Sequence, residues 1–584
     1  MRAPAHLRFA APRGEEFFQD GPELGNQYLA DVTLRTHLRR ALPAEMLAEV
    51  EPGLVRLGER AVSDIRAAGD AAEERPPRHV PYDAWGRRVD RIETSEAWRA
   101  LERVAAEEGI VATAYERAHG GLSRVHQFAK LYLYAPSSAT FSCPLAMTDG
   151  AARCLELHAG DDARLRAALA RLVSRDPARF WTSGQWMTER TGGSDVSGTS
   201  TVARPAPDVD GYRLWGTKWF TSATTSQIAL TLARIEDERG AAPAGGAALS
   251  LFYLELRDAG GALNDIRVHR LKEKLGTRAL PTAELTLEGT PAVLLGGPGN
   301  GVRKISALLN VTRLYNACCA VAGMRRAVSL ARDYAARRVA FGRPIVEHPL
   351  HAETLAALEV ECDAALHLVF RLAALLGREE CGEGSEEESA LLRLLTPVAK
   401  LYTGKQAVAV ASEALEAFGG AGYVEDTRLP QLLRDAQVLS IWEGTTNVLS
   451  LDVLRALERS AALAPFLADL DRRLAPVRSP ELAPSAARVR DAARRIERYV
   501  SDGGTAGRDA LEAGARALAF SIARTYAGAL LLEHAEWCVA AAGGELGGAA
   551  RRAGIVARRW CAGELAPLVE AGETHRGESE LLLD

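Results

Sequence analysis

The stretch GQWMTERTGGSDVSGTS, residues 184–200, separates two different patterns in this chain of 584 residues. Before it, apolar residues recur every three or four positions, as in LARLVSRDPARFW (169–181), and this spacing predicts helices. After it, Gly, Thr and Ser alternate with short apolar runs, which predict β-strands. The stretch therefore marks the start of a β domain inside an otherwise helical protein.

Four regions follow from these patterns, and together they predict an α+β protein. We expect a mostly helical domain at 1–181, a β domain at 182–296, a helical bundle at 297–460 and an additional helical extension at 461–584. Within the β domain, strands of about five residues at close spacing predict a small barrel or sandwich. Their runs are GYRLWGTKWF, QIALTLARI, ALSLFYLEL, DIRVHRL and AELTLEG.

Composition narrows the class of protein. A net charge of -5 argues against a general nucleic-acid binder, which must neutralise phosphates. The eight cysteines include no CxxC pair, so we expect reduced, buried thiols. No apolar leader opens the chain, and no run approaches the roughly 18–20 apolar residues that a membrane span needs. We expect a soluble, cytoplasmic protein.

His348 and His351 lie on either side of Pro349 and lack an acidic or thiol partner, so no metal site is predicted.

The stretch at 184–200 also has the residues of an anion-binding loop. Thr188, Gly193 and Ser194 provide hydroxyls and free backbone N–H groups, and such a nest suits a pyrophosphate or a ring carbonyl. The glycine allows a ligand to approach the backbone closely. The alternative is an ordinary turn between two strands.

A second segment, GTKWFTSATTS (216–226), places two aromatic residues beside hydroxyl side chains on a predicted strand. Trp219 and Phe220 with Ser222 would flank a planar heterocycle. An aromatic core pair is the simpler alternative, and these residues alone do not exclude it.

A third segment, IWEGTTN (441–447), places one carboxylate, Glu443, between an aromatic residue and a turn that opens a helix. Acidic residues favour helix N-termini, so a surface glutamate is the simple explanation. These residues alone do not say whether the acid has any other role.

Five segments occur in a fixed order along the chain: MTERTGGSDV, GTKWFTS, RRVAFGRPI, FGGAGYVED and IWEGTTN. With them, residues 180–460 resemble the acyl-CoA dehydrogenase superfamily of flavoproteins. The segments YDAWGRRVDRIETSEAW, FSCPLAMT and KEKLGTRALPTAEL resemble its AidB branch of alkylation-response proteins. The resemblance implies the acyl-CoA dehydrogenase fold: an N-terminal helical domain, a middle β domain and a C-terminal four-helix bundle.

The resemblance implies an FAD-dependent oxidoreductase acting on acyl-CoA. Glu443 would take the α-proton of the thioester while the β-hydride passes to flavin N5. Trp442 and Ile441 would keep the base in a dry pocket. Electron-transferring flavoprotein is the implied acceptor. Arg313 would border the CoA site, although pairing within the helical core is the alternative that we favour.

The resemblance also assigns cofactor contacts. The residues implied for the subunit's own FAD are Met187, Thr188, Gly193, Ser194, Phe220, Ser222, Trp442, Thr445 and Asn447. Those implied to reach the FAD of a neighbouring subunit are Arg338, Phe341, Glu416, Gly419 and Gly420. A homo-oligomer, a dimer of dimers, would follow. Three positions depart from the pattern of the family. Phe220 stands where most relatives carry Trp, Pro349 where many carry Gln, and Asn310, three residues before Arg313, where many carry Asp.

The AidB resemblance leaves an alternative function open: a flavoprotein with little acyl-CoA turnover that acts in DNA-associated protection against alkylating agents or in their detoxification. From 451 to 584 the chain has 18 Arg, no Lys and 19 acidic residues, a net charge of -1. Strong DNA binding is therefore not predicted. A nitroalkane-oxidising relative is disfavoured because the predicted base is Glu443 and not Asp.

Overall fold

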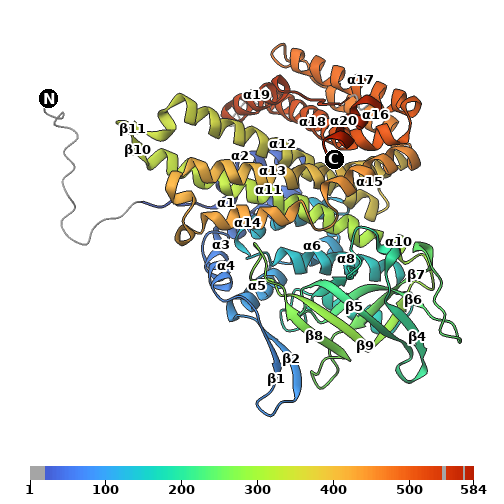
Figure 1. The fold of residues 1–584 in the computed structure, drawn as a ribbon. Helices are drawn as coiled ribbons and strands as arrows, with labels where there is room; N and C mark the ends of the chain where they lie inside the picture. Colours follow the sequence, from blue (N-terminus) through green and yellow to red (C-terminus); the bar gives the residue numbers. More distant parts are fainter. Residues whose placement is uncertain (1–19, 542–546, 570–572, 584) are drawn as a thin grey trace, which may run out of the picture.

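The computed structural model describes residues 20–541, 547–569 and 573–583. Figure 1 shows the long bundle helices across the middle of the molecule, with the N-terminal helices and the β domain below them and the C-terminal extension above. The cavity described below lies where the first three of these parts meet. The predicted α+β class is confirmed.

The N-terminal part is helical, as predicted, except for one hairpin at 78–93. Its two antiparallel strands dock on the β domain, where Ile92 packs against Val268 and Ala283. The strands are short and solvated on one side. Docking against the β domain therefore stabilises them, and their own residue pattern does not. The elements are α1 (Gln27–Ala30), α2 (Val32–Ala41), α3 (Ala44–Arg60), α4 (Asp64–Glu74), β1 (Arg78–Tyr82), β2 (Arg88–Glu93), α5 (Glu96–Glu107), α6 (Ala112–Glu116), α7 (Leu122–Tyr134), α8 (Ser142–His158) and α9 (Ala163–Leu172).

The β domain is a closed ring of strands, a small barrel. Strands β6, β4, β5, β9 and β7 pair in this order, and β7 pairs back with β6; β3 is added to β6 and β8 to β9. The bounds are β3 (Ser183–Trp186), β4 (Val202–Ala206), β5 (Gly211–Ser222), β6 (Ile228–Ile235), β7 (Leu249–Glu255), β8 (Ile266–Leu271) and β9 (Thr282–Leu295).

Five of these strands are longer than the expected five residues, and β5 and β9 are by far the longest. β5 has 12 residues and β9 has 14, and their pairing shifts register at Leu214/Trp215 and Lys218/Thr221. Such irregularities bend a long strand around a barrel. The end of β5 that follows the second shift reaches the cavity.

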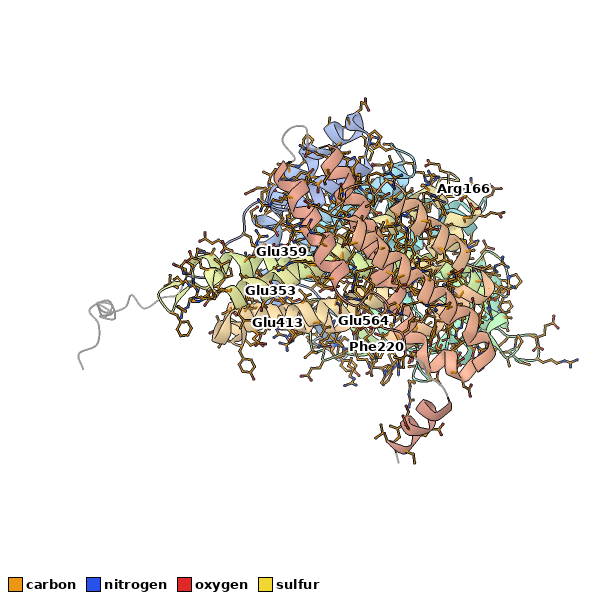
Figure 2. The ribbon with its side chains drawn as sticks, turned by 90° about the horizontal axis from the view of Figure 1, so that it is seen from above. Arg166, Phe220, Glu353, Glu359, Glu413 and Glu564 are labelled. Carbon is orange, nitrogen blue, oxygen red and sulfur yellow. The ribbon has the colours of Figure 1, made fainter. Side chains whose placement is uncertain are left out.

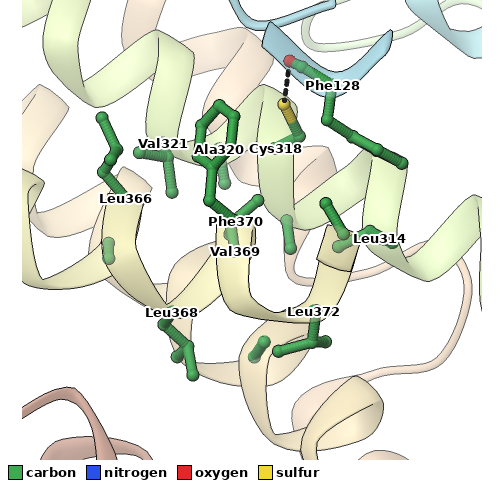
Figure 3. Close-up of a cluster of buried hydrophobic side chains, with 14 of the residues drawn as sticks. Phe128, Leu314, Cys318, Ala320, Val321, Leu366, Leu368, Val369, Phe370 and Leu372 are labelled. Carbon is green, nitrogen blue, oxygen red and sulfur yellow. Dashed lines mark hydrogen bonds between the residues drawn. The ribbon is translucent and has the colours of Figure 1, made fainter. Parts of the chain in front are cut away.

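The bundle is built on α11 (Ser306–Arg337), α12 (Pro349–Glu380) and α13 (Glu386–Ala417), with α14 (Leu429–Leu439) and α15 (Thr446–Arg459) packed on them. A short helix, α10 (Gly301–Lys304), precedes it, and the hairpin β10 (Val339–Ala340) and β11 (Arg343–Pro344) follows α11. Figure 3 shows the core between α7, α11 and α12, where the Cys318 thiol lies 3.7 Å from the Phe128 carbonyl oxygen. The sequence pattern did not predict α14.

The extension comprises α16 (Leu463–Leu474), α17 (Ala483–Ala506), α18 (Arg508–Ala540), α19 (Gly547–Ala562) and α20 (Glu573–Leu581). Its central helix, α18, packs on α12, α13 and α15 of the bundle. Within the described part of the chain, no helix is long and apolar enough to cross a membrane.

Candidate active site

One large cavity, about 1380 Å³, lies between the N-terminal helices, the barrel and the bundle. It exceeds the roughly 300–1,000 Å³ of an ordinary small-molecule pocket, so it has room for more than one ligand group. Ten of the sequence-predicted residues line it: Met187, Thr188, Gly193, Ser194, Phe220, Ser222, Arg313, Trp442, Glu443 and Thr445.

The turn that carries Glu443 has an unusual backbone. Glu443 has φ 57°, in the left-handed region, and Gly444 has φ 109°. A non-glycine residue holds this conformation only where its surroundings enforce it, and such positions concentrate at functional sites. The turn lies between α14 and α15, and it presents the half-buried Glu443 side chain to the cavity.

Three side chains from the bundle hold this turn. The Thr312 hydroxyl donates to Glu443 Oε2 at 2.7 Å, and Arg313 Nε donates to the Glu443 carbonyl at 3.3 Å. Lys400 Nζ donates to the Gly444 carbonyl at 2.6 Å. The carboxylate and both flanking carbonyls are therefore fixed by α11 and α13.

Lys400 is a fully buried cation in this arrangement. Burial lowers its pKa to about 7, against the opposing attraction of the Glu443 carboxylate. Arg313, by contrast, pairs with Asp452 at 2.9 Å. Arg313 thus lines the cavity and is also paired within the helical core; its contact with acyl-CoA stays a prediction.

The loop at 187–200 is anchored by a buried ion pair. Lys218 Nζ lies 2.9 Å from Glu189 Oε1, and both side chains are almost fully buried. Burial would raise the pKa of Glu189, but Lys218 and the hydroxyls of Ser200 and Thr201 outweigh it and lower the value to about 2. The ionised pair ties the loop to β5, which places Thr188 against that strand.

Close packing inside the loop requires a glycine. The Trp219 N–H donates to the Thr188 carbonyl at 2.9 Å, and a Cβ on Gly193 would lie 2.6 Å from Thr188 Oγ1. Any side chain at Gly193 would displace the Thr188 hydroxyl. The loop is therefore a shaped part of the cavity wall, and more than a turn between strands.

The end of β5 gives the cavity an aromatic and hydroxylated wall. Phe220 is 52% exposed, and its side chain is labelled in Figure 2. Lys272 Nζ lies 3.7 Å from the Trp219 ring centroid and 4.5 Å from that of Phe220. Ser222 Oγ lies 3.1 Å from Thr282 Oγ1. The surface can accept a planar, polar-edged ring.

The remaining predicted residues do not line this cavity. Phe341 is 97% exposed in the β10–β11 hairpin, which Figure 1 shows at the end of the bundle far from the barrel. The others are exposed on the same hairpin, at the C-terminal end of α13 and at the start of α15: Arg338, Glu416, Gly419, Gly420 and Asn447. The structure does not bring them to the cavity of their own subunit.

Family models match nearly the whole chain. The AidB N-terminal domain matches residues 22–176, the acyl-CoA dehydrogenase middle domain 184–290, the acyl-CoA dehydrogenase C-terminal domain 299–458 and the acyl-CoA dehydrogenase 11 C-terminal domain-like model 461–584. Acyl-CoA dehydrogenase family member 11 of Caenorhabditis elegans is 46% identical over 540 residues, 91% of this chain and 87% of that protein. This chain belongs to the acyl-CoA dehydrogenase family.

Further relatives agree with this assignment. The putative acyl-CoA dehydrogenase AidB of Escherichia coli is 35% identical over 69% of this chain and 73% of its own length. The structure of C. elegans ACDH-11 in complex with C11-CoA has a TM-score of 0.92 at 43% identity and covers all of this chain and 99% of that one. The AidB-like branch is thereby supported, and the chain is an acyl-CoA dehydrogenase-family oxidoreductase.

Acyl-CoA dehydrogenases are flavoproteins, so family membership indicates FAD as the cofactor, and the cavity fits one. Gln185 Oε1 is buried in the cavity wall without a hydrogen-bond partner, two residues before Met187 on the same edge. A buried acceptor without a donor is costly, and a bound ligand with a polar ring edge would satisfy it. The hydroxyls and close-packed glycine of the 187–200 loop lie on the same wall.

Sequence patterns missed three residues of this site: Gln185, Thr312 and Lys400. Thr312 and Lys400 lie in the middle of long helices, where nothing local distinguishes them from core or surface positions. The only sequence signal for Thr312 was its position directly before Arg313, which was itself a predicted site residue. Their partners are the atoms of a turn more than forty residues away, which only the tertiary fold brings near.

Proposed function

We propose that the chain oxidises an acyl-CoA thioester, with Glu443 as the base that removes the α-proton. The single observation that carries this proposal is the strained turn at Glu443, pinned by three bundle side chains in a cavity large enough for a flavin and an acyl chain together. A structural glutamate would not need a left-handed backbone or the buried Lys400 beneath it.

The chain's own residues would act as follows. The Thr312 hydroxyl aims the Glu443 carboxylate, and the bonds from Arg313 and Lys400 keep its backbone from relaxing. Bound FAD supplies the hydride acceptor for the β-carbon. The β5 end and the 187–200 loop would hold the ring so that the α-carbon lies between it and the base. The surrounding walls would exclude water from the proton transfer.

Arg338, Phe341, Glu416, Gly419 and Gly420 would hold the cofactor of a neighbouring subunit. Their exposure at one end of the bundle supports this, together with the exposed apolar side chains beside them, Val339 at 56% and Tyr423 at 90%. A homo-oligomer, a dimer of dimers, would complete each site. We expect electron-transferring flavoprotein as the acceptor.

DNA-associated protection is the weaker alternative. Several arginines of the extension form ion pairs within the chain: Arg473 pairs with Asp469, Arg552 with Glu359, and Arg558 with Glu481. Paired arginines leave little free positive charge for phosphates.

A panel of acyl-CoAs mixed anaerobically with the purified holoenzyme tests the proposal. We expect at least one thioester to bleach the flavin absorbance within seconds. Absence of bleaching with every chain length, together with salt-sensitive retention of DNA, would replace the proposal by the alternative.

A further inference from the structure

One face of α11 forms a continuous wall of the cavity. The cavity-lining residues along it follow an alternating spacing of four and three, which keeps them on one side of a helix. They are Thr312, Asn316, Cys319, Gly323, Arg326 and Leu330. The channel therefore runs along the helix away from the base.

The length of the channel follows from the geometry of α11. Thr312 bonds Glu443, and Arg326 follows 14 positions later, so the two backbones are about 21 Å apart along the axis at 1.5 Å per residue. Helical side chains lean toward the N-terminus, which brings the Arg326 guanidinium several Å nearer to the base. An extended chain advances about 1.3 Å per C–C bond, so on the order of a dozen carbons span the gap.

Arg326 is buried at this distal end without a counter-ion. It is 6% exposed, lines the cavity and forms no ion pair with a carboxylate of the described residues. Its Nη2 donates to Ser137 Oγ at 2.7 Å and to the Ala61 carbonyl at 3.4 Å, both neutral acceptors. Its Nε is buried and has no hydrogen-bond partner. A buried guanidinium in this state carries a large desolvation cost.

The nearby charges do not neutralise it. Arg66 and Asp70 are the charged groups that act on Arg326, and burial together with Arg66 lowers its pKa to about 10. Asp70 is half exposed and lies 3.3 Å from Arg428 and 3.9 Å from Arg66. The one neighbouring carboxylate is thus shared between two other arginines.

Gly323 keeps the route to Arg326 open. A Cβ built on this residue would meet no atom within 4 Å, so free space borders it. A glycine inside a helix costs about 1 kcal/mol relative to alanine, and no tight packing here requires it. Its effect is a wider channel one turn before the arginine.

We propose that Arg326 binds the anionic far end of a long acyl chain, so that the preferred substrate class is an ω-carboxylated acyl-CoA. This inference rests on the proposed function, since the thioester end must lie at Glu443. A carboxylate at the far end would accept a charge-assisted hydrogen bond from the guanidinium Nη1–H groups, because Ser137 and the Ala61 carbonyl engage only Nη2.

Binding of two matched ligands to the holoenzyme tests the inference by calorimetry: the CoA monothioester of dodecanedioic acid and dodecanoyl-CoA. We expect wild type to bind the ω-carboxylated ligand about tenfold or more tightly than the methyl-terminated one. Arg326→Met should abolish or reverse this preference, and Arg326→Lys should retain part of it. Arg332→Met, on the exposed side of α11, is the matched control and should keep it.

Gly323→Leu separates channel from charge, because it should weaken both long ligands alike. Equal affinity of wild type for the two ligands would overturn the inference. So would an Arg326→Met variant that keeps the preference for the ω-carboxylated ligand and differs from wild type only in its melting temperature. Flavin bleaching is followed in parallel. Bleaching by dodecanoyl-CoA without a preference for the ω-carboxylated ligand would refute the inference alone. A preference without any bleaching would refute the proposed oxidation alone. Failure of both ligands to bind would refute both.

Discussion

At the scale of single residues, the site depends on how Glu443 is held. Its identity followed from a family resemblance, but its backbone conformation and its three supports come only from the fold. Lys400 illustrates the difference. In the sequence it is one lysine in a long helix, whereas in the structure it is buried beneath the base.

Lys400→Met should therefore impair catalysis more than folding. Without the ammonium, the Gly444 carbonyl loses its donor and the strained turn can relax, so kcat/KM for the best thioester should fall about tenfold to a hundredfold. Stopped-flow flavin reduction measures this, with FAD content as a check. Lys405→Met, on the same helix away from the cavity, is the control. Equal kcat/KM for wild type and Lys400→Met would show that the hydrogen bond from Lys400 to Gly444 has no role in catalysis.

At the scale of elements, the strands and long helices were predictable and their connections were not. The short apolar runs marked β5 to β9 correctly, although β6 and β7 are buried on both faces rather than on one. The hairpin at 78–93, β3, β4 and α14 were missed; the hairpin is stabilised by docking against the β domain rather than by its own pattern. Strand lengths were underestimated because the bulges that bend β5 have no clear sequence signal.

The extension is joined to the rest of the chain by ion pairs. Arg552 of α19 pairs with Asp363 and, at 3.0 Å, with Glu359 of α12, and its Nη1 donates to Thr33 of α2. Figure 2 shows Glu353 and Glu359 on α12 beneath the extension.

Arg552→Met should loosen this docking by about 1–3 kcal/mol, because partly buried carboxylates lose a charged partner. Limited proteolysis should then cleave within 461–584 faster than in wild type, and the melting temperature should drop. Arg551→Met, at the exposed neighbouring position, should have no such effect. Unchanged proteolysis of Arg552→Met would mean that apolar packing alone holds the extension.

Three buried histidines at the same junction make it sensitive to acid. The Nδ1 atoms of His37 and His367 lie 2.9 Å apart, and the tilted ring of His534 from α18 has its centroid 4.4 Å from that of His367. Burial lowers the pKa of His534 to about 3, with Arg40 and Arg552 acting in the same direction, and lowers those of His37 and His367 as well.

Below the ordinary histidine pKa of about 6.5, these histidines become protonated in the unfolded chain but stay neutral in the folded one. The free energy of unfolding should therefore fall as the pH falls. His534 alone should contribute a loss of about 1.4 kcal/mol per pH unit between pH 6.5 and 3. Urea unfolding at pH 7 and 5.5 measures the slope. His534→Gln should flatten it and His269→Gln, on exposed β8, should not. Equal slopes for His534→Gln and wild type would contradict this account.

At the scale of the whole molecule, ten of the sixteen predicted site residues line one cavity, and six lie outside it. The resemblance assigns five of the six to the FAD of a neighbouring subunit and Asn447 to the FAD of its own subunit. No local pattern could decide these roles, because all six are exposed on the hairpin, at the end of α13 and at the start of α15, away from the cavity of their own subunit.

Subunit complementation tests the shared site. Arg338→Ala should weaken FAD binding about tenfold or more through loss of a charge-assisted contact, and Glu443→Gln should abolish turnover. Co-expressed as hybrids, the two variants should be more active than the sum of the separate proteins, because some cavities regain both residues. Activity equal to the average of the two variants would assign Arg338 to its own subunit.

The most direct test of the account is anaerobic flavin reduction by the best acyl-CoA in wild type and Glu443→Gln. The variant removes the base and keeps the size of the side chain. The account predicts that Glu443→Gln retains FAD and still binds the thioester, while flavin reduction slows by about 10²–10⁴-fold, the usual contribution of a positioned base. Reduction at the wild-type rate would contradict it.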